Sequence, residues 1–294
     1  MSFDVTARKS RLYHTGAVEE RLRRSLEEWS RGRSPARPPP AVPPLRIVAR
    51  VLRDRLTLSA DASGEHLHRR GYRQAVAKAP LRETLAAALL LASDWDRRTP
   101  LMDPFCGSGT LVIEGALWAR GVPPGVTRRF TFEGWPGVDP AGRDRALRGD
   151  FEARGPAGPS ITPPCVGSDR DAGAIEAAIA NARRARVEGA VTLLRAPLTG
   201  APFPELAPAG DADQGPQGLL VTNPPYGRRV GETGRLQNLY ARLGALARER
   251  WSGGRLVLLS PDPALAGQLG LETRVLFRTR NGGLPVEALA ADVP

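Results

Sequence analysis

The fold is decided by the stretch LMDPFCGSGTLVIEGALWAR at residues 101–120. An apolar run ends in Asp103, a turn with two glycines follows, and a second run of apolar helix formers begins after Thr110. Gly107 and Gly109 permit a tight turn, because glycine adopts positive φ without strain. The pattern predicts a strand at about 99–103, a turn and a helix, which is one unit of a parallel α/β sheet.

The same alternation continues toward the C-terminus. A strand at about 165–169 leads into the helical segment AGAIEAAIANARRARV, and a helix is expected at about 235–250. Further strands are expected at 191–195, 218–222 and 255–260. Strands that alternate with helices predict βαβ units and a mostly parallel sheet, with long loops at 121–164 and 197–217.

The residues before this region predict a small α+β unit. Residues 3–14 alternate like a strand, and 17–29 place Val18, Leu22, Leu26 and Trp29 at helical spacing. Two strand-like runs, 46–52 and 55–60, predict a hairpin around Arg53-Asp54. The Pro-rich stretch 34–44 predicts a stiff loop, and 81–95 predicts a buried helix.

Composition narrows the class of protein. The 294 residues contain no apolar run of about 18, and the N-terminus has no hydrophobic secretion signal, so we expect a soluble, cytoplasmic protein. Cys106 and Cys165 are too few for a disulfide framework. His14, His66 and His68 have no zinc-binding spacing, and we expect no metal site.

Positive charge is concentrated at the front of the chain. Residues 1–82 contain 18 basic and 8 acidic side chains, whereas residues 83–294 contain 24 and 23. This asymmetry predicts a module that binds a polyanion, joined to a nearly neutral catalytic one; a well-solvated terminal face is the alternative. The candidate RNA-binding residues are Arg8, Lys9, Arg11, Arg69, Arg70 and Arg73.

The glycine turn is a candidate cofactor site. The N-terminus of the following helix offers N–H groups to a carboxylate, and Asp103 offers a partner to an ammonium group. These groups suit the amino-acid end of S-adenosylmethionine, although a packing turn without a ligand is the alternative. The candidate cofactor residues are Asp103, Pro104, Phe105, Cys106, Gly107, Ser108, Gly109 and Thr110, together with Asp169, which can bind ribose hydroxyls.

A second candidate site is Asn223-Pro224-Pro225-Tyr226, directly after the strand-like GLLVT. The two prolines fix the backbone, so the Asn223 side chain and the intervening carbonyl can both accept hydrogen bonds from a base amino group. Tyr226 can stack on that base. We predict these four residues as catalytic, with Asn223 also beside the cofactor, and an ordinary loop is the alternative. An activated sulfonium methyl needs alignment with the amino nitrogen and no metal or protein nucleophile.

Three segments in this order, LMDPFCGSGTLVIEGA, GSDRDAGAIEAAIANARRA and VTNPPYGRR, resemble the THUMP-domain methyltransferases, especially the bacterial guanine-N2 methyltransferases of large-subunit ribosomal RNA. LSADASGEHLHRRGYR, KAPLRETLAAALL and RNGGLP extend the resemblance over nearly the whole chain. It implies an α/β class I (Rossmann-like) methyltransferase domain at 63–294, with an insertion at about 121–164, after a partial THUMP-like segment at 1–62. It also implies S-adenosylmethionine as cofactor and transfer to the N2 amino group of a guanosine in 23S rRNA.

The sequence departs from the family at two places. The family's THUMP domain is longer than the segment before residue 62, which predicts weaker RNA binding or help from a partner. The acid that follows the fourth strand of the family is replaced by Ala196, which predicts weaker cofactor binding unless Asp211 or Asp213 substitutes.

Two other functions stay open. A DNA or RNA adenine-N6 methyltransferase would share the glycine turn and the NPPY tetrapeptide, because both reactions deliver a methyl group to a planar amino nitrogen. A non-catalytic RNA-binding or assembly protein derived from such an enzyme would explain the short front segment and Ala196. The sequence does not indicate an oligomeric state.

Overall fold

A computed structural model gives the fold of residues 1–31, 42–74, 81–135, 137–139, 141–142, 163–206, 216–226 and 233–294. The chain forms two compact units. The first contains residues 1–69 and the described part of 128–150, and the second contains 70–127 and the described part of 151–294. The chain passes from the first unit to the second at Arg69/Arg70 and returns to the first at Thr127/Arg128, and the boundary expected from the sequence at 62/63 stays a prediction.

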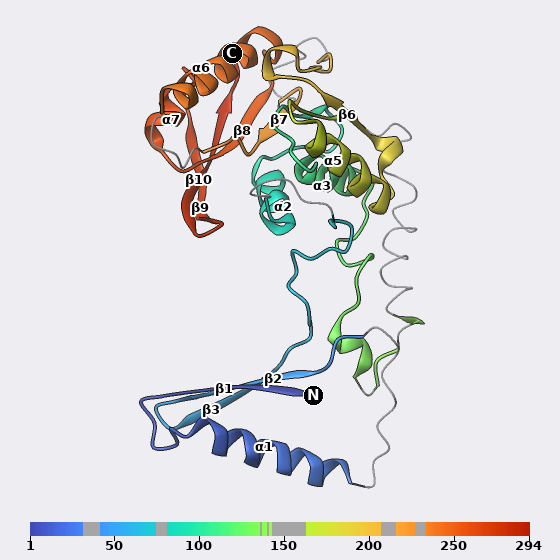
Figure 1. Cartoon of the computed structure of the whole chain (residues 1–294), viewed down its shortest axis with the longest axis vertical. Coiled ribbons are helices and arrows are strands. Elements are labelled where there is room, and N and C mark those ends of the chain that lie inside the picture. The colour runs from blue at the N-terminus through green and yellow to red at the C-terminus, as the bar shows by residue number, and fades with distance from the viewer. Residues whose placement is uncertain are drawn as a thin grey trace. The chain divides into compact units, whose positions relative to one another are not determined.

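Figure 1 labels most of the helices and strands. The strands are β1 (Ser2–Arg8), β2 (Arg46–Leu52), β3 (Arg55–Ala60), β4 (Leu101–Asp103), β5 (Cys165–Asp169), β6 (Val191–Arg195), β7 (Leu219–Thr222), β8 (Arg255–Ser260), β9 (Arg274–Asn281) and β10 (Leu284–Asp292). The helices are α1 (Thr15–Ser30), α2 (Glu83–Ala92), α3 (Thr110–Ala119), α5 (Ala172–Arg184), α6 (Thr233–Arg250) and α7 (Pro263–Gly267). Short 3-10 turns lie at Thr131–Gly134, Glu188–Ala190 and Leu198–Gly200.

The first unit is a three-stranded sheet with one helix beside it (Figure 1). β1 pairs with β2 in parallel, and β2 pairs with β3 through a hairpin whose two turn residues, Arg53 and Asp54, both have positive φ. Such a turn matches the right-handed twist of the strands. The predicted strands 46–52 and 55–60 and the helix in 17–29 are confirmed.

The second unit is built on a seven-stranded sheet with the strand order β6-β5-β4-β7-β8-β10-β9. From β4 at the centre the chain moves outward through β5 to β6, then returns to β7 on the other side of β4 and continues to β8. These strands are parallel. The reversal between β4 and β7 is a topological switch point, where ligands bind in open α/β sheets.

Alternate strand residues pack into two separate cores. On one face, β8 contributes Val257 and Leu259 to a core built with α2, α3 and α5. On the other face, Leu256 and Leu258 pack with α6 and α7. The sheet is therefore covered on both sides, which explains why its strands are continuous apolar runs in the sequence.

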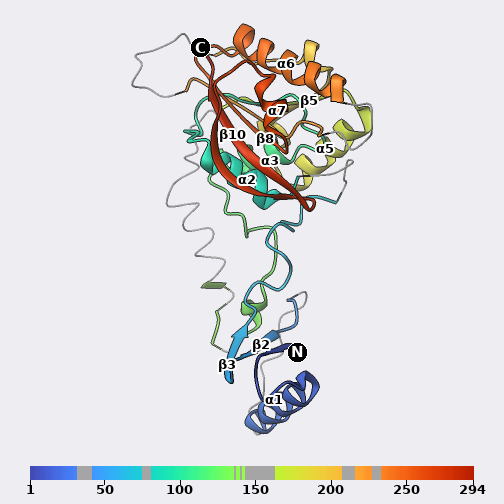
Figure 2. The same ribbon diagram turned by 90° about the vertical axis from the view of Figure 1, so that its left-hand side faces the viewer.

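The sheet ends in a hairpin that was not predicted from the sequence. β9 and β10 are antiparallel and are joined at Gly282 and Gly283, both with positive φ; Figure 2 shows this hairpin in red. β10 also pairs antiparallel with β8. Two strand-like runs on either side of an Asn-Gly turn were the available signal.

The packing of α6 against the segment after α7 allows a test of the fold. A Cβ atom at Gly244 would lie 1.9 Å from the carbonyl oxygen of Leu269, whereas one at Gly234, in the same helix, would meet nothing within 4 Å. We predict that Gly244→Ala lowers the free energy of unfolding by about 1–3 kcal/mol or more, because backbone must move. Gly234→Ala is the matched control and leaves stability unchanged or slightly raised. Denaturant unfolding measures both, and equal midpoints would contradict this packing.

Candidate active site at the carboxyl edge of the central strands

The two predicted site segments meet at the switch point. Asp103 ends β4 and Thr222 ends the neighbouring β7, and both are buried. The Thr222 hydroxyl donates a hydrogen bond to Asp103 Oδ1 at 2.6 Å. This bond joins the strand that leads into the glycine turn to the strand that leads into Asn223.

The glycine turn is held in one shape by hydrogen bonds within it and to β5. Inside it, the Gly109 N–H donates to the Cys106 carbonyl at 2.8 Å. Toward β5, the Cys106 N–H donates to the Ser168 carbonyl at 3.0 Å, and the Gly107 N–H donates to Asp169 Oδ2 at 3.1 Å. Because these three donors are engaged within the protein, the N–H groups left for a ligand carboxylate are those of Ser108 and of the first turn of α3.

Space remains beside this turn. A Cβ atom on Gly107 would meet nothing within 4 Å, whereas one on Gly109 would lie 3.0 Å from Ala178 Cβ. Both glycines have positive φ, as the sequence predicted for a tight turn. Gly109 is therefore required for packing against α5, and Gly107 borders open space.

Asp103 carries a strongly perturbed carboxyl group. Burial raises its pKa to about 7, although the bonds from the Thr222 hydroxyl and the Phe105 N–H, at 3.0 Å, act in the opposite direction. Nearby Asp169 raises it further. The group gains its charge near neutral pH, so a cationic partner beside it would favour the ionised form.

Asp169 and Asp171 have different local roles. Asp169 Oδ1 accepts from the Asp171 N–H at 2.9 Å, and Oδ2 accepts from Gly107. The Asp171 side chain caps α5 by accepting from the N–H groups of Gly173 and Ala174, as expected of an acid at the start of a helix. Each Asp169 oxygen has a second lone pair, so the carboxylate can still accept from a ligand hydroxyl.

The Asn-Pro-Pro-Tyr segment follows β7. Asn223 and Tyr226 are half-buried, Pro224 is buried and Pro225 is exposed. The Tyr226 hydroxyl donates to Asn223 Oδ1. Burial raises the pKa of Tyr226 to about 12, so this hydroxyl keeps its proton at neutral pH.

Asn281, at the end of β9, is a site residue that was not predicted from the sequence. Its Nδ2 donates to the Tyr226 hydroxyl oxygen at 3.4 Å. The β9–β10 hairpin thus brings a side chain to the tetrapeptide from 55 residues away. The position could have been found from the Asn-Gly-Gly turn, which places Asn281 at a hairpin end.

Ala196, at the position where the family resemblance implies an acid, lies directly after β6, and its N–H donates to the Asp169 carbonyl at 2.9 Å. The position therefore borders the carboxyl end of β5. Asp211 and Asp213 lie outside the described residues.

The predicted RNA-binding residues separate into two groups. Arg8, Lys9, Arg11 and Arg69 are exposed. Arg70 and Arg73 are instead engaged in the second unit: Arg70 is 8% exposed and pairs with Glu114 at 3.1 Å, and Arg73 pairs with Glu83 at 3.0 Å. Their guanidinium groups are not available to phosphate.

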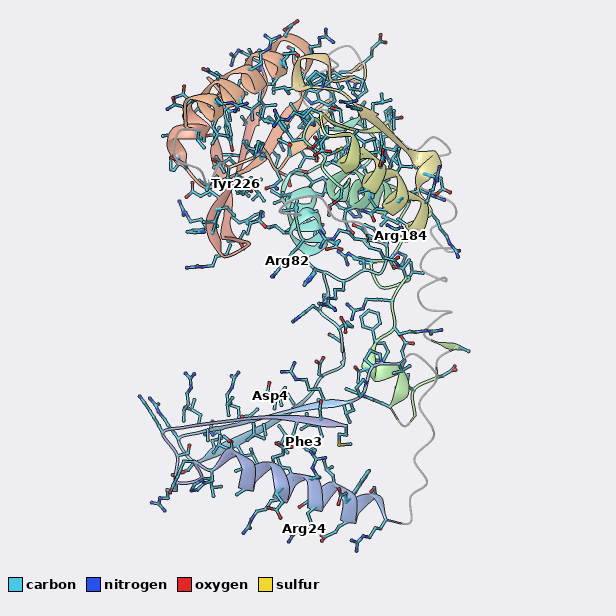
Figure 3. The ribbon with its side chains drawn as sticks, in the orientation of Figure 1. Phe3, Asp4, Arg24, Arg82, Arg184 and Tyr226 are labelled. Atoms are coloured by element: carbon cyan, nitrogen blue, oxygen red, sulfur yellow. The ribbon has the colours of Figure 1, made fainter. Side chains whose placement is uncertain are left out.

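One face of the three-stranded sheet adds further cations. Figure 3 shows Phe3 on the side of β1 that faces α1 and Asp4 on the other side. Leu52 of β2 pairs with Arg8 on one side and with Arg55 on the other, so these two arginines lie on the same face of the sheet as Asp4. Arg50 pairs with Thr6 and lies on that face too. Arg8, Arg50 and Arg55 are all exposed and are here called the basic sheet face. Arg50 and Arg55 were not proposed from the sequence, although both strands that carry them were predicted.

Metal-binding and membrane-spanning features are absent from the described ranges. Within them, no group of three or more His, Cys, Asp or Glu side chains is arranged to hold a metal ion. In the same part of the chain, no helix has both the length and the apolar character needed to cross a bilayer.

The strand order, with an antiparallel last strand inserted beside β8 and a glycine turn after β4, defines the class I methyltransferase fold, which confirms the predicted fold class. Residues 70–284 match the model of the UPF0020 family, described as RMKL-like, methyltransferase domain. The chain belongs to this family, as the sequence resemblance predicted.

Individual relatives agree with this assignment. The chain is 38% identical over its whole length to the ribosomal RNA large subunit methyltransferase K/L of Syntrophotalea carbinolica, and the match covers 41% of that protein. SMU.472, described as a methyltransferase and solved with SAH, superposes with a TM-score of 0.77 at 27% identity, covering 100% of this chain and 75% of the other. A Listeria monocytogenes protein described as a predicted N6-adenine-specific DNA methylase superposes with a TM-score of 0.76 at 27% identity. That match covers 100% of this chain and 73% of the other. The chain thus spans about two fifths of that curated K/L relative.

The shifted carboxyl of Asp103 predicts a pH effect on stability. Its pKa is about 7 in the folded protein, against 3.8 for an unperturbed aspartate, so the folded state binds the proton more tightly. The free energy of unfolding therefore falls as pH rises from 4 to 7, by about 2–4 kcal/mol from this group. Asp103→Asn removes that contribution.

Thermal unfolding of the ligand-free protein between pH 5 and pH 8 measures it. As pH rises, the Tm of the wild type should fall relative to the Tm of the Asp103→Asn variant. Parallel curves for the two proteins would show that Asp103 is ionised throughout.

Proposed function

We propose that this chain binds S-adenosylmethionine and transfers its methyl group to an exocyclic amino nitrogen of RNA, specifically the N2 amino group of a guanosine in 23S rRNA. The observation that carries the proposal is the hydrogen bond between Thr222 and Asp103, because it holds a cofactor-type turn next to an Asn-Pro-Pro-Tyr segment. The family assignment supports methyl transfer, and the name of the K/L relative supports ribosomal RNA.

The residues around the glycine turn fit this cofactor. The first turn of α3 presents N–H groups and the positive end of the helix to a carboxylate. Asp103 is a buried carboxyl that an ammonium group would hold in its ionised form. Asp169 retains acceptor capacity for ribose hydroxyls, and the open space beside Gly107 allows a ligand to approach the backbone. The cofactor supplies an activated methyl group on sulfur.

The tetrapeptide supplies the acceptors for the target base. Asn223 Oδ1 and the Pro224 carbonyl accept hydrogen bonds from the amino group, which draws electron density toward its nitrogen and orients it. The Tyr226 ring stacks on the base and offsets part of the free energy needed to extrude it. The Tyr226 hydroxyl donates to Asn223 Oδ1 and accepts from Asn281, and the second lone pair of Asn223 Oδ1 can accept from the amino group.

Cys106 is assigned a packing role. Burial raises the pKa of its thiol well above the usual value, and nearby Asp103 and Asp169 raise it further. A thiol that keeps its proton at neutral pH is a poor nucleophile.

RNA is proposed to bind through the basic sheet face together with Lys9, Arg11 and Arg69. Exposed guanidinium groups beside the Thr6 hydroxyl suit phosphate oxygens. Ala196 keeps a non-catalytic role as the alternative of another class. Adenine-N6 methylation is the catalytic alternative, and the structural likeness to a protein described as an adenine methylase agrees with the chemistry shared by both bases.

The role of Asn223 can be tested by substitution. We predict that Asn223→Ala lowers kcat at least about a hundredfold, because it removes an acceptor that orients the amino group in the transition state. Binding of RNA should stay within about twofold of the wild type. The assay measures transfer of labelled methyl to unmodified large-subunit ribosomal RNA. Wild-type turnover by the variant would remove Asn223 from the mechanism.

The basic sheet face predicts salt-dependent RNA binding. The triple variant Arg8→Gln, Arg50→Gln, Arg55→Gln should reduce the slope of log affinity against log salt by about 0.7–0.9 for each phosphate that the protein no longer neutralises. The matched control changes three exposed arginines of α1 and its end, Arg21, Arg24 and Arg31, by the same charge. Figure 3 shows Arg24 on the side of α1 away from the sheet. Equal slopes for the two triple variants would contradict a role for the basic sheet face.

A further inference from the structure

One carbonyl of the glycine turn is held by a side chain from a neighbouring helix. Asn181, on α5, is fully buried, and its Nδ2 donates to the Ser108 carbonyl at 3.1 Å. The next carbonyl, of Gly109, already belongs to the ladder of α3, where it accepts from the Ile113 N–H at 2.9 Å. Ser108 thus lies just outside the helix, and Asn181 fixes the peptide plane that precedes it.

The same face of α5 packs directly on the turn. Ala178 lies almost one helical turn before Asn181, and a Cβ on Gly109 would lie only 3.0 Å from its Cβ. The turn and the helix are therefore in close contact at two successive positions. Because the contact is close-packed, a change in the position of the Asn181 amide would also move the backbone of the turn.

The orientation of the Asn181 amide is set by Arg184. The guanidinium NH2 of Arg184 donates to Asn181 Oδ1 at 2.6 Å. A guanidinium cannot accept a hydrogen bond, so the amide oxygen must face Arg184 and the amide NH2 must face Ser108. Figure 3 labels Arg184 at the end of α5.

Arg184 is in turn held by the segment with which the second unit begins. Its Nε donates to the Tyr72 carbonyl at 2.8 Å. The Tyr72 hydroxyl donates to Glu114 Oε1 at 2.9 Å, and Arg70 bonds both oxygens of Glu114 at 3.1 Å. Glu114 lies on α3, so the chain of contacts runs from the glycine turn to the helix that follows it.

We propose that Asn181 is a positioning residue for the cofactor: its amide, oriented by Arg184 and the buried Tyr72 segment, fixes the Ser108 carbonyl and with it the turn that receives the amino-acid end of S-adenosylmethionine. This inference rests on the cofactor site proposed above. It assigns a binding function to a network that otherwise looks like ordinary core structure.

The test compares four proteins of residues 1–294: wild type, Asn181→Asp, Arg184→Ala and Arg183→Ala. Asn181→Asp keeps the side-chain shape and the Arg184 contact but replaces the donor facing Ser108 with an acceptor. Arg184→Ala removes the guanidinium donor that orients the Asn181 amide oxygen. Arg183 is the exposed neighbour of Arg184 and provides the matched loss of charge.

Isothermal titration with S-adenosylhomocysteine gives Kd, and methyl transfer gives KM for the cofactor and kcat. Asn181→Asp should raise both Kd and KM about tenfold, because a buried carbonyl loses its donor. At saturating cofactor kcat should stay within about twofold, since a positioning residue for binding does not touch the reacting atoms. Arg184→Ala should show a smaller rise in Kd, and Arg183→Ala none.

Failure of the inference can be separated from failure of the proposed function. If the wild type does not bind S-adenosylhomocysteine, the cofactor assignment fails. If the wild type binds and Asn181→Asp binds equally well, Asn181 has no positioning role. If Asn181→Asp does not fold, Arg184→Ala decides: a Kd equal to that of Arg183→Ala overturns the proposal.

Discussion

The hydrogen bond between the Thr222 hydroxyl and the Asp103 carboxyl is the contact on which the site depends. The two residues end adjacent strands at the switch point of the sheet, so the bond brings together segments that are 119 residues apart in the sequence. The glycine turn leaves one strand and the Asn-Pro-Pro-Tyr segment leaves the other. A methyl donor bound at the first segment and a methyl acceptor bound at the second would therefore lie next to each other.

Burial determines the protonation and the pairing of the charged residues near the carboxyl edge of the sheet. Asp103 is removed from water beside a second carboxylate, Asp169, and its pKa rises accordingly. Arg70 is buried with Glu114, where the paired charges join the Tyr72 segment to α3. Part of the basic excess of the front segment thus stabilises the second unit. The exposed remainder on the first unit is what can attract RNA.

Much of the fold followed from local pattern. The strands at 165–169, 191–195 and 255–260 were predicted to the residue, because each is a short run bounded by turn or loop residues. The position of β10 between β8 and β9 could not be predicted, because strand order depends on pairing rather than on local pattern. The hairpin itself and Asn281 at its end were missed, although the Asn-Gly-Gly turn was a local signal for both. Arg70 could not be distinguished from surface arginines, because its partner Glu114 is 44 residues away.

The most direct test of the proposed activity is to identify the methylated nucleoside. The protein is incubated with labelled S-adenosylmethionine and unmodified large-subunit ribosomal RNA, and the RNA is digested and analysed by mass spectrometry. We predict label in N2-methylguanosine. Label in N6-methyladenosine would contradict the base assignment while retaining the site, and no label together with no cofactor binding would contradict the assignment of a catalytic site.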